Sequence, residues 1–251
     1  MTYYPEIIRL EEVDSTSRWL ADRADSLSNG QAVTALRQVA GRGQRGNSWE
    51  SEPGRNLTMS VLLQFSDVPA IRQFSVSEAV ALAVVDVVRP YLPEGSSLRV
   101  KWPNDIYVGD RKICGTLIEN RLSGSRIERS IAGIGLNVNQ REFFSDAPNP
   151  VSIIQLTGEE NAVDVLAEEL RDRVMEYVAD CETEEGRTNL HRRFLERLWR
   201  RPGLFPYSDT STGQQFEAEI LDVEPTGHLI LRLPDHSLRR YAFKEVAQII
   251  R

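Results

Sequence analysis

Residues 100–120 read VKWPNDIYVGDRKICGTLIEN. Apolar and polar residues alternate along them, with a break at Pro103-Asn-Asp and a turn at Gly109-Asp110, so the segment predicts a β-hairpin. Side chains on the returning strand point alternately to its two faces. This period places Lys112, Cys114, Thr116 and Ile118 on one face and Arg111, Ile113, Gly115 and Leu117 on the other. Lys112 then begins a largely uncharged face, where its ammonium group is available to a ligand or, equally well, to solvent. Gly115, three residues on, leaves room for a ligand.

Residues 38–56, QVAGRGQRGNSWESEPGRN, carry four glycines and three arginines in place of an apolar period, which predicts a loop. Glycines let the backbone approach a ligand closely, and guanidinium groups match phosphate or carboxylate oxygens, so the loop favours an anion. Gly41, Gly43 and Gly46 have the spacing of a dinucleotide-binding fingerprint. No helix is predicted after Gly46, however, and we reject a Rossmann site. A solvated surface turn is the alternative interpretation.

Residues 131–139, IAGIGLNVN, predict a third strand with two unlike faces. Alternate residues from Ala132 to Val138 are apolar and indicate a core face. The other face has two positions without side chains, Gly133 and Gly135, followed by the amide of Asn137. Such a floor can admit a flat group, such as a purine, and hydrogen-bond its edge. A strand packed tightly under a helix would show the same pattern.

The rest of the chain alternates helix-like and strand-like segments up to about residue 200. Helices are predicted from Ser15 or Thr16 to Leu27, from Ser75 to Leu92 as a buried helix with Ser77 as its cap, and across residues 163–174 and 190–198. After Pro202-Gly203, short strands are predicted within residues 216–220, 223–233 and 241–250, which suits a barrel of about 50 residues. We therefore expect two domains, residues 1–201 and 202–251.

Composition narrows the class of protein. The chain has 251 residues and a net charge of −7, the wrong sign for coating a polyanion, so no nucleic-acid partner is expected. It has no apolar run of about 20 residues and no secretory leader, which predicts a cytoplasmic protein without a membrane partner. Cys114 and Cys181 lack metal-ligand or disulfide spacing and are expected to be ordinary buried thiols.

Five motifs, in order and spacing, resemble those of the biotin protein ligase family. They are Asp14-Ser-Thr-Ser, the Gln38-x-x-Gly-Arg-Gly-x-x-Gly loop, Lys101-Trp-Pro-Asn-Asp-x-Tyr, Arg111-Lys-x-x-Gly and Gly133-x-Gly-x-Asn. The resemblance implies an α+β fold: a class II synthetase-like catalytic domain with a mixed β-sheet flanked by helices, and a small C-terminal SH3-like β-barrel. Many relatives begin with a DNA-binding domain, whereas this chain begins at the catalytic domain, so a monofunctional enzyme is expected.

The resemblance also implies roles for individual residues. Lys112 matches the catalytic lysine. Because the acid and the polyphosphate repel each other, we expect Lys112 and Arg42 to act as the catalytic cations that bridge the carboxylate and the α-phosphate. The residues that match the biotin site are Ser15, Thr16, Gln38, Gly41, Arg42, Gly43, Lys112, Gly115 and Gly133. Those that match the ATP site are Arg45, Trp49, Asn104, Asp105, Lys112 and Asn137, with Trp49 covering adenine and Asn137 reading it. Gln44 and Asn47 stand where many relatives have arginine, and the effect of this change on the phosphate contacts is left open.

The expected reaction is the ATP-dependent activation of biotin to biotinyl-5'-AMP, followed by transfer to a lysine of a biotin carboxyl carrier protein. Mg²⁺ is expected to arrive with ATP, near Asn104 and Asp105, rather than to be fixed by the protein alone. Two alternatives stay open: a lipoate or octanoate attachment enzyme of the same fold, and a non-catalytic vitamin or nucleotide sensor. The oligomeric state is also open, and a homodimer is one candidate.

Overall fold

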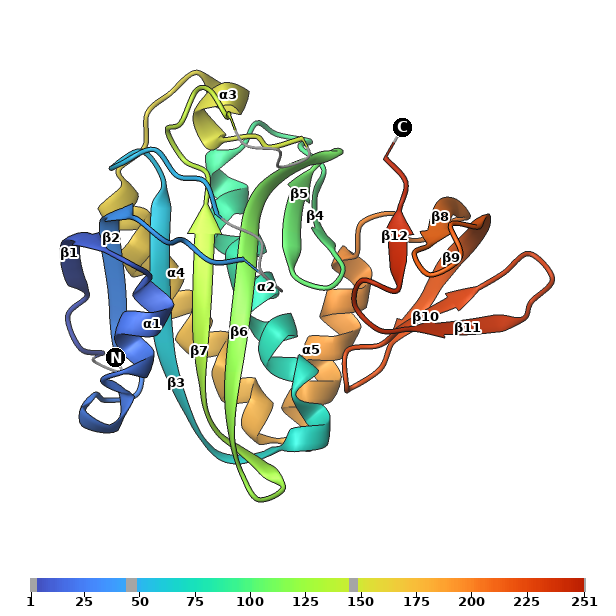
Figure 1. Cartoon of the computed structure of the whole chain (residues 1–251), viewed down its shortest axis with the longest axis horizontal. Coiled ribbons are helices and arrows are strands. Elements are labelled where there is room, and N and C mark those ends of the chain that lie inside the picture. Colours follow the sequence, from blue (N-terminus) through green and yellow to red (C-terminus); the bar gives the residue numbers. More distant parts are fainter. Residues whose placement is uncertain (1–3, 44–48, 145–148, 251) are drawn as a thin grey trace.

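A seven-stranded mixed sheet forms the larger part of the protein (Figure 1). The computed structural model describes residues 4–43, 49–144 and 149–250. Only the first pair of strands is parallel, and every other neighbouring pair is antiparallel. The order across the sheet is β1 (Ile8–Val13), β2 (Ala32–Gln38), β3 (Leu57–Pro69), β7 (Arg126–Leu136), β6 (Arg111–Ser123), β5 (Asp105–Val108) and β4 (Leu98–Lys101). The predicted hairpin and the predicted third strand are thus confirmed as β5, β6 and β7.

Helices cover both faces of this sheet, which confirms the expected mixed sheet flanked by helices (Figure 1). The three long helices lie on one face and bury the main hydrophobic core, whereas a short helix on the opposite face covers a second, smaller cluster. The long helices are α2 (Phe74–Val88), α4 (Val163–Ala179) and α5 (Glu184–Arg197); the short ones are α1 (Thr16–Ala21) and α3 (Ile153–Thr157). Single 3₁₀ turns are η1 (Ala24–Ser26), η3 (Ala70–Arg72), η4 (Arg89–Tyr91) and η5 (Asp180–Glu182).

Helix α2 is buried nearly all round, as its apolar sequence predicts, but it begins earlier than expected. Ser77 lies inside the helix and does not cap it, and the residue before the first turn is Gln73. Tertiary contacts hold the extra turn: the Phe74 ring packs edge-on against Phe194 at 5.5 Å, and the Phe74 N–H donates to the Pro225 carbonyl at 3.1 Å. The prediction of Ser77 as the cap was wrong because these contacts are non-local.

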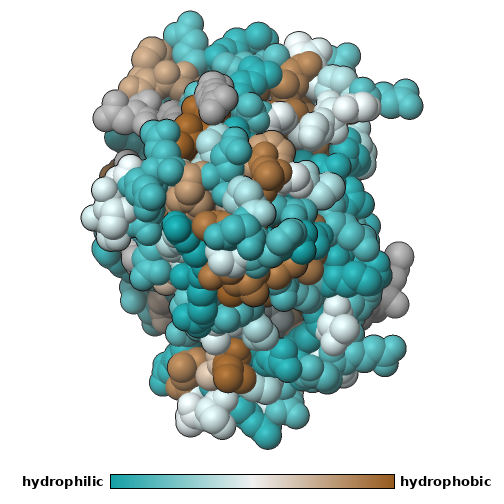
Figure 2. All heavy atoms as spheres, turned by 90° about the vertical axis from the view of Figure 1, so that its right-hand side faces the viewer, coloured by the Kyte–Doolittle hydropathy of each residue, from teal (hydrophilic) through white to brown (hydrophobic). Residues whose placement is uncertain are grey.

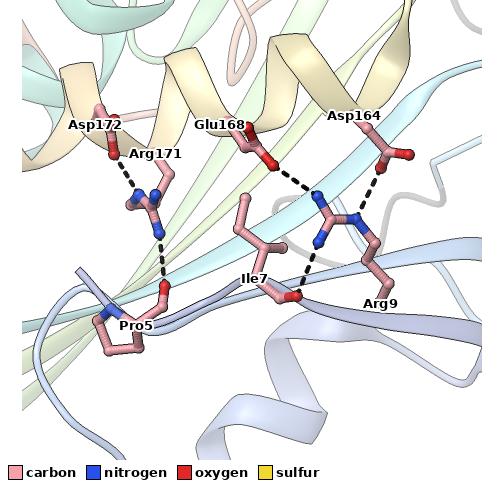
Figure 3. Close-up of polar contacts among 7 residues, drawn as sticks. All are labelled: Pro5, Ile7, Arg9, Asp164, Glu168, Arg171 and Asp172. Carbon is pink, nitrogen blue, oxygen red and sulfur yellow. Dashed lines mark hydrogen bonds and ion pairs between the residues drawn. The ribbon is translucent and has the colours of Figure 1, made fainter. Parts of the chain in front are cut away.

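The edge strand β1 is tied to helix α4 by arginines (Figure 3). Arg9 of β1 donates to Asp164 at 3.1 Å and to Glu168 at 2.9 Å, both on the exposed side of α4. Arg171, on the same helix, donates to the Pro5 carbonyl at 2.7 Å. These contacts join the first described residues of the chain to a helix more than 150 residues later.

A second, five-stranded antiparallel sheet follows α5. Its order is β11 (Leu238–Tyr241), β10 (Leu229–Arg232), β9 (Gln215–Val223), β8 (Phe205–Asp209) and β12 (Val246–Gln248). The predicted strands are confirmed as β9, β10 and β12, whereas β8 and β11 are additional strands that the sequence pattern did not show. The expected boundary at residue 201 falls between α5 and β8 and stays a prediction.

Three kinds of contact join the two sheets. The indole Nε1 of Trp102 donates to the Gly227 carbonyl at 3.0 Å. The imidazole of His191 lies between two carboxylates, at 2.8 Å from Glu78 on α2 and at 2.8 Å from Asp222 on β9. Phe74 adds the backbone hydrogen bond described above. The C-terminal sheet is therefore held in a defined position beside the first.

The surface on the side of the C-terminal sheet is largely hydrophilic, with hydrophobic residues in separate patches (Figure 2). Among the residues that the structure describes, no helix is long and apolar enough to cross a membrane. The most apolar helix, α2, uses its hydrophobic residues for packing inside the protein.

Candidate active site

One cleft of about 710 Å³ collects most of the residues that the sequence singled out. It lies over the faces of β6 and β7 that carry Gly115, Gly133 and Gly135. The residues after β2, strand β5 and the residues after β7 border it. The expected site residues that line it are Ser15, Thr16, Gln38, Arg42, Gly43, Trp49, Asn104, Asp105, Lys112, Gly115, Gly133 and Asn137. Gly41 is near but not in the lining, and Arg45, like Gln44 and Asn47, lies outside the described residues.

A β-bulge decides where Lys112 points. Ile106 of β5 pairs with Cys114 and Tyr107 with Lys112, so β6 has one extra residue, Ile113, at this step. Ile113 and Cys114 are both fully buried, and Lys112 turns to the side of Gly115, where its Nζ would lie 3.1 Å from a Cβ. The prediction that Lys112 shares a face with Cys114 and Thr116 was therefore wrong.

Lys112 is held as one half of an ion pair. Its Nζ lies 2.7 Å from Oδ1 of Asp105, and about a quarter of each side chain is exposed. The same ammonium group lies 5.6 Å from the centre of the Trp49 ring. The backbone of Lys112 is also fixed, because its N–H donates to the Asn149 carbonyl and its own carbonyl accepts from Val151, both at 2.8 Å. The cation is thus partly buried, paired and well positioned on the cleft wall.

Arg42 points across the cleft to β6. Its guanidinium lies 2.8 Å from Oε1 of Glu119, and both side chains are more exposed than the Lys112 pair, at 42% and 38%. Because exposed pairs of this kind contribute little to stability, Arg42 can exchange this partner for another anion at small cost.

Hydroxyl and amide groups gather at the end of the cleft next to α1. The backbone N–H and the hydroxyl of Thr16 donate to Oε1 of Gln38, at 2.8 and 3.1 Å. Ser60 lies within hydrogen-bond distance of the hydroxyls of both Thr16 and Ser17. Ser15 precedes α1 but makes no capping hydrogen bond; its side chain is buried in the cleft lining instead. The hydroxyls that predict a helix start therefore belong to this polar end.

Two glycines allow close approach at the polar end of the cleft and behind it. A Cβ on Gly133 would lie 2.7 Å from the Ser17 hydroxyl, so a larger residue would displace the polar end of the cleft. A Cβ on Gly41 would lie 2.9 Å from the Trp49 carbonyl, and the Gly41 carbonyl accepts from the Trp49 N–H at 3.2 Å. Gly41 therefore closes the loop behind the site, which explains why it does not line the cleft.

The indole of Trp49 lies on the glycine floor of β7. A Cβ on Gly135 would be 2.3 Å from the ring, and one on Gly115 would be 3.1 Å from it. The Trp49 Nε1–H is buried and has no hydrogen-bond partner among the described residues. The glycine floor is present and the chain's own indole rests on it, whereas the place of a purine stays a prediction.

Two asparagines are placed differently. The side-chain amide of Asn104 donates to the Thr116 carbonyl, and Thr116 returns a hydrogen bond to the Asn104 carbonyl at 3.1 Å, so Asn104 braces the turn before β5. Asn137 donates to the Val151 carbonyl at 3.0 Å. Its Oδ1 is buried without a partner among the described residues, which leaves an acceptor for a ligand amino group.

Several residues of the cleft escaped the sequence analysis. Lys101, next to Trp102, lies over the Tyr107 ring at 5.2 Å, and burial lowers the pKa of its ammonium group. Lys101 begins the Lys101-Trp-Pro-Asn-Asp-x-Tyr motif, but its neighbours in the sequence do not distinguish a ligand-binding lysine from a structural one. Phe243 reaches the cleft from the C-terminal sheet, and no motif around it in the sequence indicates a site residue. Glu50, Phe143 and Phe144 also line the cleft.

We also searched the described residues for a cluster of metal ligands and for an activated cysteine. The described residues contain no group of three or more His, Cys, Asp or Glu side chains placed to hold a metal ion. Both cysteines are free and buried, as expected, and burial raises the pKa of the Cys181 thiol to about 12, so it is not an activated nucleophile.

Residues 10–137 match the model of the biotin/lipoate A/B protein ligase family. The bifunctional ligase/repressor BirA of Escherichia coli is 36% identical over 140 residues, which cover 56% of this chain and 43% of that protein. The biotin–[acetyl-CoA-carboxylase] ligase of Paracoccus denitrificans is 33% identical over 159 residues, covering 62% and 65%. The chain thus spans less than half the length of the BirA proteins that it matches.

Solved structures show the same fold over nearly the whole chain. The biotin protein ligase of Aquifex aeolicus, in complex with biotin and ATP, superposes with a TM-score of 0.77 at 22% identity, covering 98% of this chain and 100% of that one. The enzyme of Leishmania major with biotinyl-5-AMP gives 0.60 at 24% identity, covering 95% and 99%. The two-sheet architecture is therefore that of biotin protein ligases, and since the family model spans half of its residues, the chain belongs to the biotin/lipoate A/B protein ligase family.

Proposed function

We propose that this protein uses ATP to convert biotin to biotinyl-5'-AMP and then transfers the biotinyl group to a lysine of a biotin carboxyl carrier domain. Family membership supports a ligase of this chemistry, and the names of the relatives support biotin as the acid. The observation that carries the proposal is the layout of the cleft: polar groups around Thr16 at one end, an aromatic ring and an amide acceptor without a described partner at the other, and the cations Lys112 and Arg42 in the same lining.

The central cations fit the first half-reaction. A carboxylate oxygen of biotin attacks the α-phosphorus of ATP, a new P–O bond forms, and the bond to diphosphate breaks. Two unit charges about 4 Å apart interact by ~4 kcal/mol at an effective dielectric near 20, so the approach of two anions is opposed. Lys112 and Arg42 lie where they can offset this repulsion by contacting both anions, which is electrostatic stabilisation without a nucleophilic side chain.

Lys112 and Arg42 already have carboxylate partners, which the substrates must replace. Asp105 holds Lys112 and Glu119 holds Arg42 in the described structure. When the acid and the nucleotide enter, their oxygens replace these partners. The Asp105 carboxylate is then available to a cation bound to the phosphates, and Mg²⁺ commonly binds through one or two carboxylates plus phosphate oxygens. When bound, Mg²⁺ would neutralise the polyphosphate; Asp105 would hold it, while Asn104, whose amide is used internally, would only position the turn.

The nucleotide end has features that suit adenine. The exposed face of the Trp49 indole offers a stacking surface, because the other face lies on Gly135. The unpartnered Oδ1 of Asn137 can accept from an exocyclic amino group. In the second half-reaction, a carrier lysine attacks the acyl carbon and AMP leaves, while the residues around the cleft keep water away from the adenylate.

The leading alternative is attachment of lipoate or octanoate, because the matching family includes lipoate ligases. A sensor without turnover is the other. The test is diphosphate release by the purified chain with Mg²⁺-ATP and biotin, lipoate or octanoate in turn, followed by mass spectrometry for the acyl-adenylate and for a modified carrier domain. Preference for biotin with carrier modification supports the proposal. Release with lipoate only would favour the first alternative, and binding without release would favour the sensor.

A further inference from the structure

Glu50 connects the two segments that border the cleft. It directly follows Trp49, and its Oε1 accepts hydrogen bonds from the Phe144 backbone N–H at 2.9 Å and from the Gln140 side chain at 3.2 Å. Trp49 belongs to the segment that carries Arg42 and Gly43, whereas Phe144 belongs to the segment after β7. One carboxylate oxygen thus joins residues that are 94 positions apart in the chain.

Gln140 makes this connection firm. It is 2% exposed, and its Oε1 accepts from the Glu52 N–H at 3.0 Å and from the Asn56 amide at 2.5 Å. Its Nε2 donates to the Glu142 carbonyl at 2.8 Å as well as to Glu50. A buried amide that satisfies this many partners is a rigid anchor, so Glu50 is oriented toward the segment after β7.

The segment that Glu50 holds needs external support. Phe143 and Phe144 line the cleft, and Phe144 is 83% exposed, so its ring gains little from burial. An exposed aromatic side chain at the cleft mouth is not placed by core packing. Gln155 holds the Arg141 carbonyl at 2.6 Å and Gln140 holds the Glu142 carbonyl, and the hydrogen bond from the Phe144 N–H to Glu50 extends this support to the end of the described segment.

We propose that Glu50 is a positioning residue that latches the described segment 141–144 to Trp49, so that Phe143 and Phe144 are held at the nucleotide end of the cleft. This inference rests on the proposed function for its ligands. Loss of this latch frees Phe143 and Phe144 from their place beside Trp49 and weakens nucleotide binding, whereas the polar end around Thr16 is unchanged.

Electrostatics gives the test a clear sign. Glu50 lines a cleft that takes a triphosphate, and two like charges repel. If Glu50 were only a surface charge, its removal would strengthen ATP binding. If it is a latch, its removal weakens ATP binding in spite of the lost repulsion.

Glu52 supplies a matched control. It borders the neighbouring pocket two residues further on, carries the same charge and has an exposed side chain, whereas its link to Gln140 runs through its backbone N–H. E52A therefore removes one negative charge from the same loop and leaves the latch intact.

The first measurement is hydrogen–deuterium exchange of the ligand-free protein. In E50A, amides of residues 141–144 should exchange about 10-fold faster than in wild type, because a hydrogen bond to a charged acceptor is lost, whereas E52A should match wild type. E50Q keeps one acceptor oxygen and should fall between the two. Unchanged protection in E50A would overturn the latch, whatever the activity of the protein.

The second measurement is steady-state adenylate formation. E50A should raise the KM for ATP about 10-fold, with kcat within about 3-fold and the biotin Kd of the nucleotide-free protein within about 2-fold of wild type. E50Q should recover part of the loss, and E52A should leave the KM for ATP unchanged or lower it. A lower KM in E50A, or equal effects of E50A and E52A, would refute the inference. If wild type forms no adenylate, the proposed function fails, and the exchange experiment still decides the latch.

Discussion

The cleft side of β6 and β7 and the C-terminal sheet use their side chains in opposite ways. On β7, the positions that face the cleft are glycines, and the contacts there are so close that a Cβ at Gly135 would overlap the Trp49 ring. In the C-terminal sheet, the rings of Tyr207, Phe216 and Tyr241 stack in series, with centres 5.9 and 6.0 Å apart. The cleft face of β7 lacks side chains, whereas the C-terminal sheet is packed with aromatic rings. The missing side chains leave space on the cleft floor, and the filled sheet contributes Phe243 to the lining of the cleft.

Replacing Lys112 by Ala should produce the largest effect on the cleft side. Loss of this cation should lower the rate of adenylate formation by about 10²–10³-fold, because one preorganised electrostatic contact in an active site is of this size. The melting temperature should stay close to wild type, since Lys112 is partly exposed. Diphosphate release measures the rate, and R111A, at the exposed neighbouring position, is the control. Near-normal release by K112A would remove the cation from the mechanism.

Replacing Gly135 by Ala tests the empty floor itself. The added Cβ would meet the Trp49 ring at 2.3 Å, so the indole must move, and the KM for ATP should rise about 10-fold. The effect should vanish when Trp49 is already absent, so the double variant G135A/W49A should bind ATP as W49A does. Additive losses would show that Gly135 acts on ATP by another route than the indole.

Replacing Phe243 by Ala tests how much the filled sheet contributes to the site. The ring lies edge-on to Trp102 at 6.1 Å and lines the cleft. An aromatic pair of this kind is worth about 1 kcal/mol, so kcat/KM for ATP should fall about 3-fold. L238A, which removes an exposed side chain of the same sheet, should have no effect. Full activity of F243A would make the C-terminal sheet a scaffold only.

Replacing His191 by Gln tests the joint between the two regions and should have the smallest effect. The hydrogen bond to Glu78 raises the pKa of His191, and the nearby carboxylate of Asp222 acts in the same direction, while burial opposes them. Glu78 itself is buried, which raises the pKa of its carboxyl group.

The direction of the pH dependence follows from the raised imidazole pKa. The charged imidazole stabilises the folded protein fully below its ordinary pKa of about 6.5, and this stability is lost as pH rises through the higher folded value. Wild type should therefore melt about 2–4 °C above H191Q at about pH 6, and the difference should shrink toward about pH 9. Thermal unfolding at several pH values measures it. A difference that grows with pH would contradict the assignment.

The main features of the site follow from local patterns in the sequence. The alternation around Gly133 and Gly135 predicts a strand with an open face, and the arginine-glycine loop predicts an anion site; both segments meet at the cleft. The hairpin is also correct. The predicted orientation of Lys112 is wrong, because a bulge at Ile113 shifts the alternation of side chains by one residue. No residue type in the sequence marks this bulge.

Other features depend on partners that are distant in the chain. Phe243 enters the cleft only because the C-terminal sheet docks beside Trp102. Glu50 is one acidic residue in a polar loop until Gln140 and Phe144 are brought next to it. The early start of α2 likewise depends on Phe194 and Pro225.

The sequence by itself determined the strand and helix types, the open floor of the cleft and the kinds of charged group around it. These features depend on the period of one chain segment and on which positions lack a side chain, and both can be read from neighbouring residues. The tertiary structure alone decided which way Lys112 points, what rests on the glycine floor and which residues hold the two borders of the cleft together. Those outcomes depend on pairing register and on packing between distant segments, which no local pattern encodes.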